Sequence, residues 1–261
     1  MEVLGYFALI GLGIILSLIG GGGSLLSVPI LVYLFSFDIV TATTYSLFIV
    51  GASSLFGAIQ KIRTDGADLT IAFVFGCSSA AAIFITRRWL VPAIPDVLTI
   101  AGDFAMTKRT LILVIFSLIV IASSVMLLWK QDSPLPTCGR RKLKFLLPVG
   151  FPTGLIAGMV GIGGGVIILP ALITLARLPF RIAVGTALLV ISFNSLFGFL
   201  TDAATDKVDW IFLLLITFFA SIGMFVGNFY NEKIPVRLVR LSFGWFLLAV
   251  GVCIILNEIV L

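Results

Sequence analysis

The sequence predicts an all-α polytopic membrane protein of two inverted repeats, each a glycine-tipped re-entrant or broken helix pair plus three transmembrane helices. Three observations predict this fold. Of the 261 residues, 60% are hydrophobic and only 29 are charged, 17 basic and 12 acidic. Six long apolar segments each approach the about 20 helical residues that cross a bilayer. Two further apolar regions are broken by glycines, and the two halves of the chain resemble each other.

The composition excludes several classes of protein. A typical globular chain is about a quarter charged, whereas this one is 11% charged and has a mean hydropathy of +1.23. The net charge of +5 therefore indicates orientation in a membrane and not nucleic-acid binding. The chain has no histidine, and its three cysteines form neither a disulfide framework nor a zinc pattern. Since HExxH and GxSxG motifs are also absent, we expect no enzyme activity, metal or cofactor.

The elements follow one another in the same order in both halves. The six expected full spans lie at about 41–60, 69–86, 110–129, 182–200, 209–227 and 237–257. The glycine-broken regions are 3–35 and 143–176. Their second arms, 24–35 and 166–176, are about 17 Å long at helical rise, so they are expected to reach the middle of the membrane only. A polar linker, 130–142, separates the N-terminal repeat, 1–129, from the C-terminal repeat, 143–261.

A shift of 141 positions superimposes the two halves without a gap. Matches between glycines, prolines, serines and aspartates carry the argument, because an apolar chain produces chance matches between leucines. The run 54–57 and the run 195–198 are both Ser-Leu-Phe-Gly. Other coincident residues are Gly13 with Gly154, Gly20 with Gly161, Pro29 with Pro170 and Asp68 with Asp209. The chain is therefore interpreted as a duplication, with Pro29 and Pro170 in structural roles.

The basic residues predict how the halves are oriented. If each glycine-broken region returns to the side it entered, three crossings per half place twelve basic residues on one side and five on the other. If each region crosses once, the split is nine to eight. The positive-inside rule favours the first arrangement, in which the halves are inverted. We expect a multi-pass protein of the plasma membrane, the inner membrane of a bacterium, with the linker 130–142 in the cytoplasm and both termini outside.

The glycine breaks predict an anion site. Each precedes a half-helix whose first amides have no intrahelical acceptor and carry partial positive charge. Glycine lets an anion approach these amides closely, so a small anion can be held at the middle of the bilayer without a buried Lys or Arg. Small polar residues within the following spans are expected to add donors. The candidate substrate-binding residues are Gly22, Gly23, Ser24, Ser53, Ser54, Gly163, Gly164, Gly165, Asn194 and Ser195.

Each of these features also has an interpretation as ordinary packing. Gly150, Gly154 and Gly158 have the small-xxx-small spacing that lets membrane helices touch, and hydroxyls often join such helices. We favour a ligand role over packing for Asn194 alone among the polar residues. Asp68 and Asp209 stand at the entrances of spans, where they are predicted to be helix N-caps, with coupling to proton movement as a weaker alternative.

The doubled glycine pattern has a known counterpart. The sequence Gly20-x-Gly22-Gly23 to Pro29, repeated as Gly161-x-Gly163-Gly164-Gly165 to Pro170, resembles the TauE/SafE family of sulfite and organosulfonate exporters over nearly the whole chain. The resemblance implies a secondary transporter that exports sulfite or an organosulfonate such as sulfoacetate by alternating access. An anion channel, an importer of an oxyanion such as thiosulfate, a membrane enzyme and a non-transporting scaffold are the alternatives. A second copy of the chain is a candidate partner.

Overall fold

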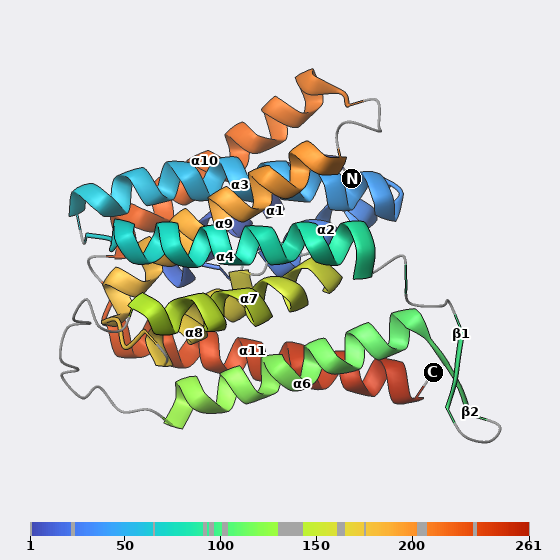
Figure 1. The fold of residues 1–261 in the computed structure, drawn as a ribbon. Coiled ribbons are helices and arrows are strands. Elements are labelled where there is room, and N and C mark those ends of the chain that lie inside the picture. The colour runs from blue at the N-terminus through green and yellow to red at the C-terminus, as the bar shows by residue number, and fades with distance from the viewer. Residues whose placement is uncertain are drawn as a thin grey trace.

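The computed structural model describes residues 2–21, 24–64, 66–90, 93, 97–100, 104–129, 143–160, 165–174, 176–202, 208–231 and 234–260. Most of these residues are helical, and the long helices lie side by side in one bundle (Figure 1). Each of the six expected full spans corresponds to one long helix. The order of elements is therefore the same in both halves, two helices around a glycine break followed by three long helices.

The helix bounds are as follows. The N-terminal half contains α1 (Glu2–Ile19), α2 (Ser24–Leu34), α3 (Ile39–Thr64), α4 (Leu69–Ile85), the π-helical turn η1 (Thr86–Leu90) and α6 (Lys108–Trp129). The C-terminal half contains α7 (Leu143–Val160), α8 (Gly165–Thr174), α9 (Phe180–Asp202), α10 (Trp210–Asn231) and α11 (Val236–Val260). The short arms α2 and α8 have 11 and 10 residues, about half of what a full crossing needs.

One element differs from the all-helical expectation. Strands β1 (Val97–Ile100) and β2 (Phe104–Thr107) form an antiparallel pair in which Val97 lies opposite Thr107. The pair extends from one end of the bundle, between α4 and α6 (Figure 1). These segments are rich in β-branched and aromatic residues, which favour strands, but they are too short and too close to prolines to be distinguished from a loop in the sequence.

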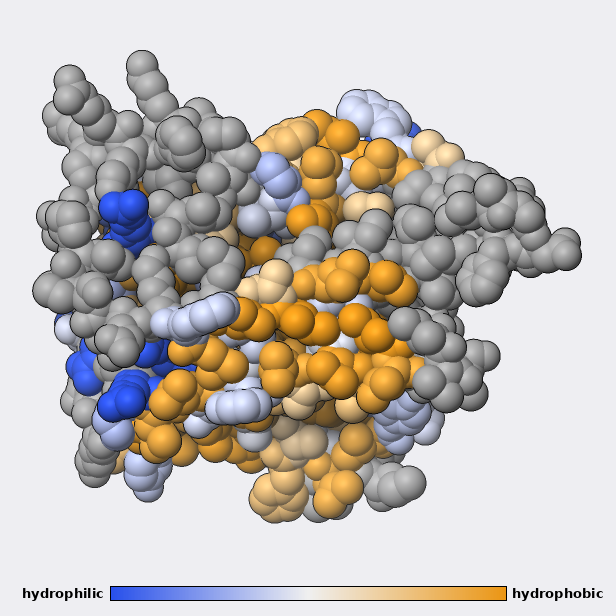
Figure 2. Space-filling model, turned by 90° about the horizontal axis from the view of Figure 1, so that it is seen from below, coloured by the Kyte–Doolittle hydropathy of each residue, from blue (hydrophilic) through white to orange (hydrophobic). Residues whose placement is uncertain are grey.

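Five described helices are long and apolar enough to cross a membrane, over 41–64, 69–90, 180–201, 210–230 and 237–256. Their outward faces are apolar: Ile211, Phe218 and Phe225 of α10 are 85%, 62% and 58% exposed. Figure 2 shows hydrophobic residues across the middle of one face and hydrophilic residues gathered toward its left end. A surface of this kind suits lipid and not water, so the chain is a multi-pass integral membrane protein.

Equivalent positions of the two halves adopt the same local structure. Ser36 and Arg177, which are 141 residues apart, both have a positive φ, 58° and 55°. Each follows the end of a short arm, α2 or α8, where a left-handed residue closes a helix. The same backbone hydrogen bond accompanies both turns, from Phe37 N to Leu31 O and from Leu178 N to Leu172 O, each 3.2 Å long.

The central contact of the bundle joins α3 to α9. A Cβ on Gly51 would lie 2.9 Å from Leu196 Cγ, and a Cβ on Gly198 would lie 3.4 Å from Leu47 Cδ1. Positions advance along α3 as they decrease along α9, so the two helices run antiparallel. We name the end of the bundle where α3 finishes and α9 begins the Lys61 end, and the opposite end, where α3 begins and α9 finishes, the Tyr45 end.

Two further crossings join the halves through glycine. A Cβ on Gly13 of α1 would lie 2.0 Å from Ala220 O of α10, and one on Gly154 of α7 would lie 2.3 Å from Ser79 O of α4. These contacts are also 141 residues apart. Gly150 and Gly158 face α4 in the same way, so the small-xxx-small prediction for this stripe is confirmed.

Candidate functional site

The two glycine breaks meet inside the bundle. A Cβ on Gly21 would lie 2.2 Å from Gly165 O, and a Cβ on Gly165 would lie 2.6 Å from Gly21 O. Both distances are shorter than any Cβ tolerates, so only glycine permits this approach of the two backbones. The four predicted site residues within the breaks, Gly22, Gly23, Gly163 and Gly164, lie outside the described residues.

Helix α8 begins at this contact, near the middle of α9. A Cβ on Gly165 would lie 3.1 Å from Ile191 Cδ1, and Ile191 precedes Ser195 by about one helical turn. The first amides of α8 therefore lie at about the depth of the polar residues of α9. In the other half, α2 begins at Ser24, whose side chain is outside the described set.

The equivalent residues Ser54 and Ser195 are buried without exposed surface. Their hydroxyls have no hydrogen-bond partner among the described residues. A buried hydroxyl left without a partner costs about 1–3 kcal/mol, and a serine in a helix can usually bond a carbonyl of the preceding turn. Ser53 does so, donating to Ile49 O at 2.5 Å. Both repeats thus retain one polar group that is available to a ligand.

Asn194 pairs with Ser79 of α4. Asn194 Nδ2 donates to Ser79 Oγ at 2.8 Å, and Ser79 Oγ lies 3.0 Å from Asn194 Oδ1. Ser79 Oγ also donates to Gly76 O at 3.1 Å. In this structure, the amide therefore joins two helices, and its predicted role in substrate binding stays a prediction.

Asn194→Ala is expected to destabilise the protein by about 1–3 kcal/mol, because it leaves the buried Ser79 hydroxyl with only an intrahelical bond. A double-mutant cycle with Ser79→Ala, read by thermal unfolding, measures the coupling between the two side chains. If Asn194 also binds substrate, Asn194→Ala should weaken ligand binding more than Ser79→Ala does. Equal loss of binding in both variants would leave Asn194 as a contact between helices.

Asp68 and Asp209 cap the helices α4 and α10. Asp68 Oδ1 accepts from Ile71 N at 2.9 Å, and Asp209 Oδ1 accepts from Ile211 N at 3.1 Å and Phe212 N at 3.2 Å. The N-cap prediction is confirmed for both residues. A further part in proton coupling stays a prediction.

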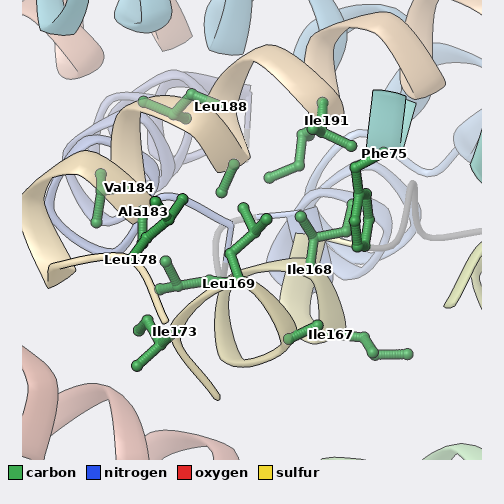
Figure 3. Close-up of a cluster of buried hydrophobic side chains, with 14 of the residues drawn as sticks. Phe75, Ile167, Ile168, Leu169, Ile173, Leu178, Ala183, Val184, Leu188 and Ile191 are labelled. Atoms are coloured by element: carbon green, nitrogen blue, oxygen red, sulfur yellow. The ribbon is translucent and has the colours of Figure 1, made fainter. Parts of the chain in front are cut away.

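The surroundings of α8 are apolar. Figure 3 shows Ile168 and Leu169 clustered with Phe75 of α4 and with Leu188 and Ile191 of α9. Pro170 is buried inside α8, whereas its equivalent Pro29 in α2 is exposed. The breaks are thus enclosed by close-packed side chains.

Comparison with known proteins follows from this arrangement of two glycine breaks in an apolar bundle. The sequence model of the family described as Sulfite exporter TauE/SafE matches residues 6–254. This chain belongs to the TauE/SafE family. It is a membrane transporter of that family.

Three relatives of this TauE/SafE chain carry transporter names. Probable membrane transporter protein YdhB of Bacillus subtilis is 28% identical over 224 residues, covering 86% of this chain and 88% of the relative. A probable membrane transporter protein of Xylella fastidiosa is 27% identical, covering 93% and 90%. YunE of Bacillus subtilis, also a probable membrane transporter protein, is 24% identical, covering 96% and 94%. No solved structure matches the chain.

A groove of about 620 Å³ lies elsewhere on this TauE/SafE protein, between α3, α4 and α9. Exposed side chains such as Phe73 and Leu200 line it, and nearly all of its surface is apolar. A small anion needs hydrogen-bond donors, so this groove does not fit the predicted substrate.

Lys61 is a feature that sequence reasoning missed. It lies in the last turn of α3 and is 1% exposed, with its Cβ packed against Gly185 of α9. The sequence places it beside Arg63, in what reads as the solvated end of a span. Its burial comes from the antiparallel contact of α3 with α9, which leaves no signal in the local sequence.

Proposed function

We propose that this protein exports a small sulfur-containing anion, sulfite or an organosulfonate such as sulfoacetate, by alternating access. The anion binds where the two glycine breaks meet. The contact between Gly21 and Gly165 carries this proposal, because it brings the two breaks, one from each half, to one place in the bundle. The amides at the start of α8 supply partial positive charge there, and the hydroxyls of Ser54 and Ser195 supply donors.

The proposal includes two inverted halves, 1–129 and 143–261, joined by the linker 130–142. Its support is the antiparallel contact of α3 with α9: helices at equivalent positions of a duplicated chain run in opposite directions only if the halves are inverted. The Lys61 end then faces the cytoplasm of the bacterial cell, in accordance with the positive-inside rule. The described basic residues at helix ends there are Lys61, Arg63, Arg177, Arg181, Arg237 and Arg240.

Single cysteines test this orientation. In a chain whose native cysteines are replaced, cysteines at Glu2 and Val260 should react with an impermeant maleimide added outside intact cells. A cysteine at Leu135 should react only after the membrane is opened. Reaction of all three from one side would contradict the inverted arrangement.

The substrate is tested with the purified protein. We expect sulfite or sulfoacetate to raise the unfolding temperature, since a ligand at 100 times its Kd stabilises by about 2.7 kcal/mol. Thiosulfate, sulfate and small carboxylates are the comparison ligands. Ser54→Ala and Ser195→Ala should each weaken binding about tenfold, because each removes a buried donor.

Ser117→Ala is the matched control. This buried serine of α6 donates to Val114 O within its own helix, away from the breaks, and its removal should leave ligand binding unchanged. A protein with no thermal shift for any of these anions would contradict the proposed substrate class. Flux through liposomes that neither saturates nor depends on a counter-ion would favour a channel instead.

A further inference from the structure

Two hydrogen bonds join the halves at equivalent positions. Asp68 N donates to Thr186 Oγ1 at 3.0 Å, and Asp209 N donates to Tyr45 OH at 2.8 Å. Both donors and both acceptors are separated by 141 residues, so these are the same contact made twice with the roles of the halves exchanged. Each bond runs from the residue that caps a long helix of one half to a long helix of the other half.

The two bonds lie at opposite ends of the bundle. Thr186 is in the second turn of α9, at the Lys61 end, and Tyr45 is in the second turn of α3, at the Tyr45 end. The antiparallel contact of α3 with α9 separates them along the bundle. One bond is therefore near each end of the path that an anion takes through the centre.

Both acceptors are held in place. Thr186 is buried, and its hydroxyl also donates to Ile182 O at 2.7 Å. Tyr45 is 4% exposed, and its ring lies 5.3 Å from the ring of Phe37 and 6.4 Å from that of Phe212. Because the donor amides belong to the caps of α4 and α10, each bond holds the start of a long helix of one half against the other half.

We propose that these two hydrogen bonds are the latches of alternating access. The bond between Asp68 and Thr186 holds the Lys61 end closed, and the bond between Asp209 and Tyr45 holds the Tyr45 end closed. In this structure both bonds are formed and the glycine breaks are in contact, so the central region is closed at both ends. Opening toward one end breaks only the bond at that end. This inference rests on the proposed transport cycle, and it goes beyond the anion site.

The test removes one acceptor at a time. Thr186→Val and Tyr45→Phe keep the shape of each side chain and remove the oxygen. A reporter cysteine at Ser54, in a chain whose native cysteines are replaced, is labelled with an impermeant maleimide from either side of oriented membrane vesicles. Losing one hydrogen bond shifts a two-state equilibrium by about fivefold. We expect Thr186→Val to raise labelling about fivefold from the Lys61 end only, and Tyr45→Phe from the Tyr45 end only.

Two controls separate a latch from a simple stabilising contact. Thr186→Ser keeps the hydroxyl and should label as the unmodified chain does. Ser124→Ala removes a different bond between the halves, from Ser124 Oγ to Gly244 O at 2.7 Å, and should lower the unfolding temperature without changing the labelling. Labelling that stays constant in both latch variants, or rises from the same side in both, overturns the proposal.

The outcome is distinguishable from failure of the proposed function. If the unmodified chain is labelled rapidly from both sides at once, alternating access itself fails. If the unmodified chain is protected but the variants open the wrong end, the latches alone are wrong. The experiment measures opening and not anion binding, so it does not depend on the identity of the substrate.

Discussion

Replacement of Gly21 by valine is expected to abolish transport while the protein still inserts into the membrane. The valine Cβ would lie 2.2 Å from the carbonyl oxygen of Gly165, and neither backbone can move without displacing the start of α8. Overpacking of this kind costs about 1–3 kcal/mol in stability, and it also separates the two breaks that the anion site needs. Insertion is unaffected because valine is more apolar than glycine. Anion flux in proteoliposomes and thermal unfolding measure the two effects.

Gly11→Val in α1 is the matched control, because a Cβ at Gly11 meets no atom within 4 Å. That variant should transport and unfold as the unmodified protein does. Transport at the unmodified rate in Gly21→Val would contradict both the close contact of the breaks and the site built on it. Loss of transport with an unchanged unfolding temperature would indicate that the contact matters for the anion more than for folding.

Gly154→Leu should destabilise the protein by about 3 kcal/mol or more, the largest effect that we expect on stability. The new Cβ would lie 2.3 Å from Ser79 O, and the branched side chain would force α7 away from α4. Gly13→Leu should have a similar effect, because its Cβ would lie 2.0 Å from Ala220 O at the equivalent crossing of α1 with α10. Thermal unfolding in detergent measures both.

The control for these variants is Gly11→Leu, which introduces the same side chain in α1 where nothing is within 4 Å. Because the two crossings share no residues, the losses in Gly13→Leu and Gly154→Leu should add in the double variant. A large loss in only one of the two would contradict the equivalence of the crossings.

The sequence was most informative where its signal is local or periodic. Apolar length predicted the spans, since a helix must supply about 20 apolar residues to cross a bilayer. The capping by Asp68 and Asp209 was predictable because an N-cap depends on the residues of one turn. The strands 97–100 and 104–107 were missed because two four-residue strands give too weak a pattern.

The site was harder to predict than the fold. Glycine clusters and buried serines have the same appearance in a sequence whether they bind a ligand or pack helices. The structure separates some of them: Gly154 packs against Ser79, Asn194 is bonded to Ser79, and Ser195 keeps an unpartnered hydroxyl. These differences depend on which helix faces each residue.

The sequence by itself determined the membrane class, the duplication, the spans and the family resemblance, because hydropathy and repeated residues are properties of the chain alone. The tertiary structure alone decided that Gly21 meets Gly165, that Lys61 is buried, and that Thr186 and Tyr45 each hold a capping residue of the other half. The physical reason is that these contacts join residues more than one hundred positions apart. They exist only once antiparallel packing has brought the two halves together.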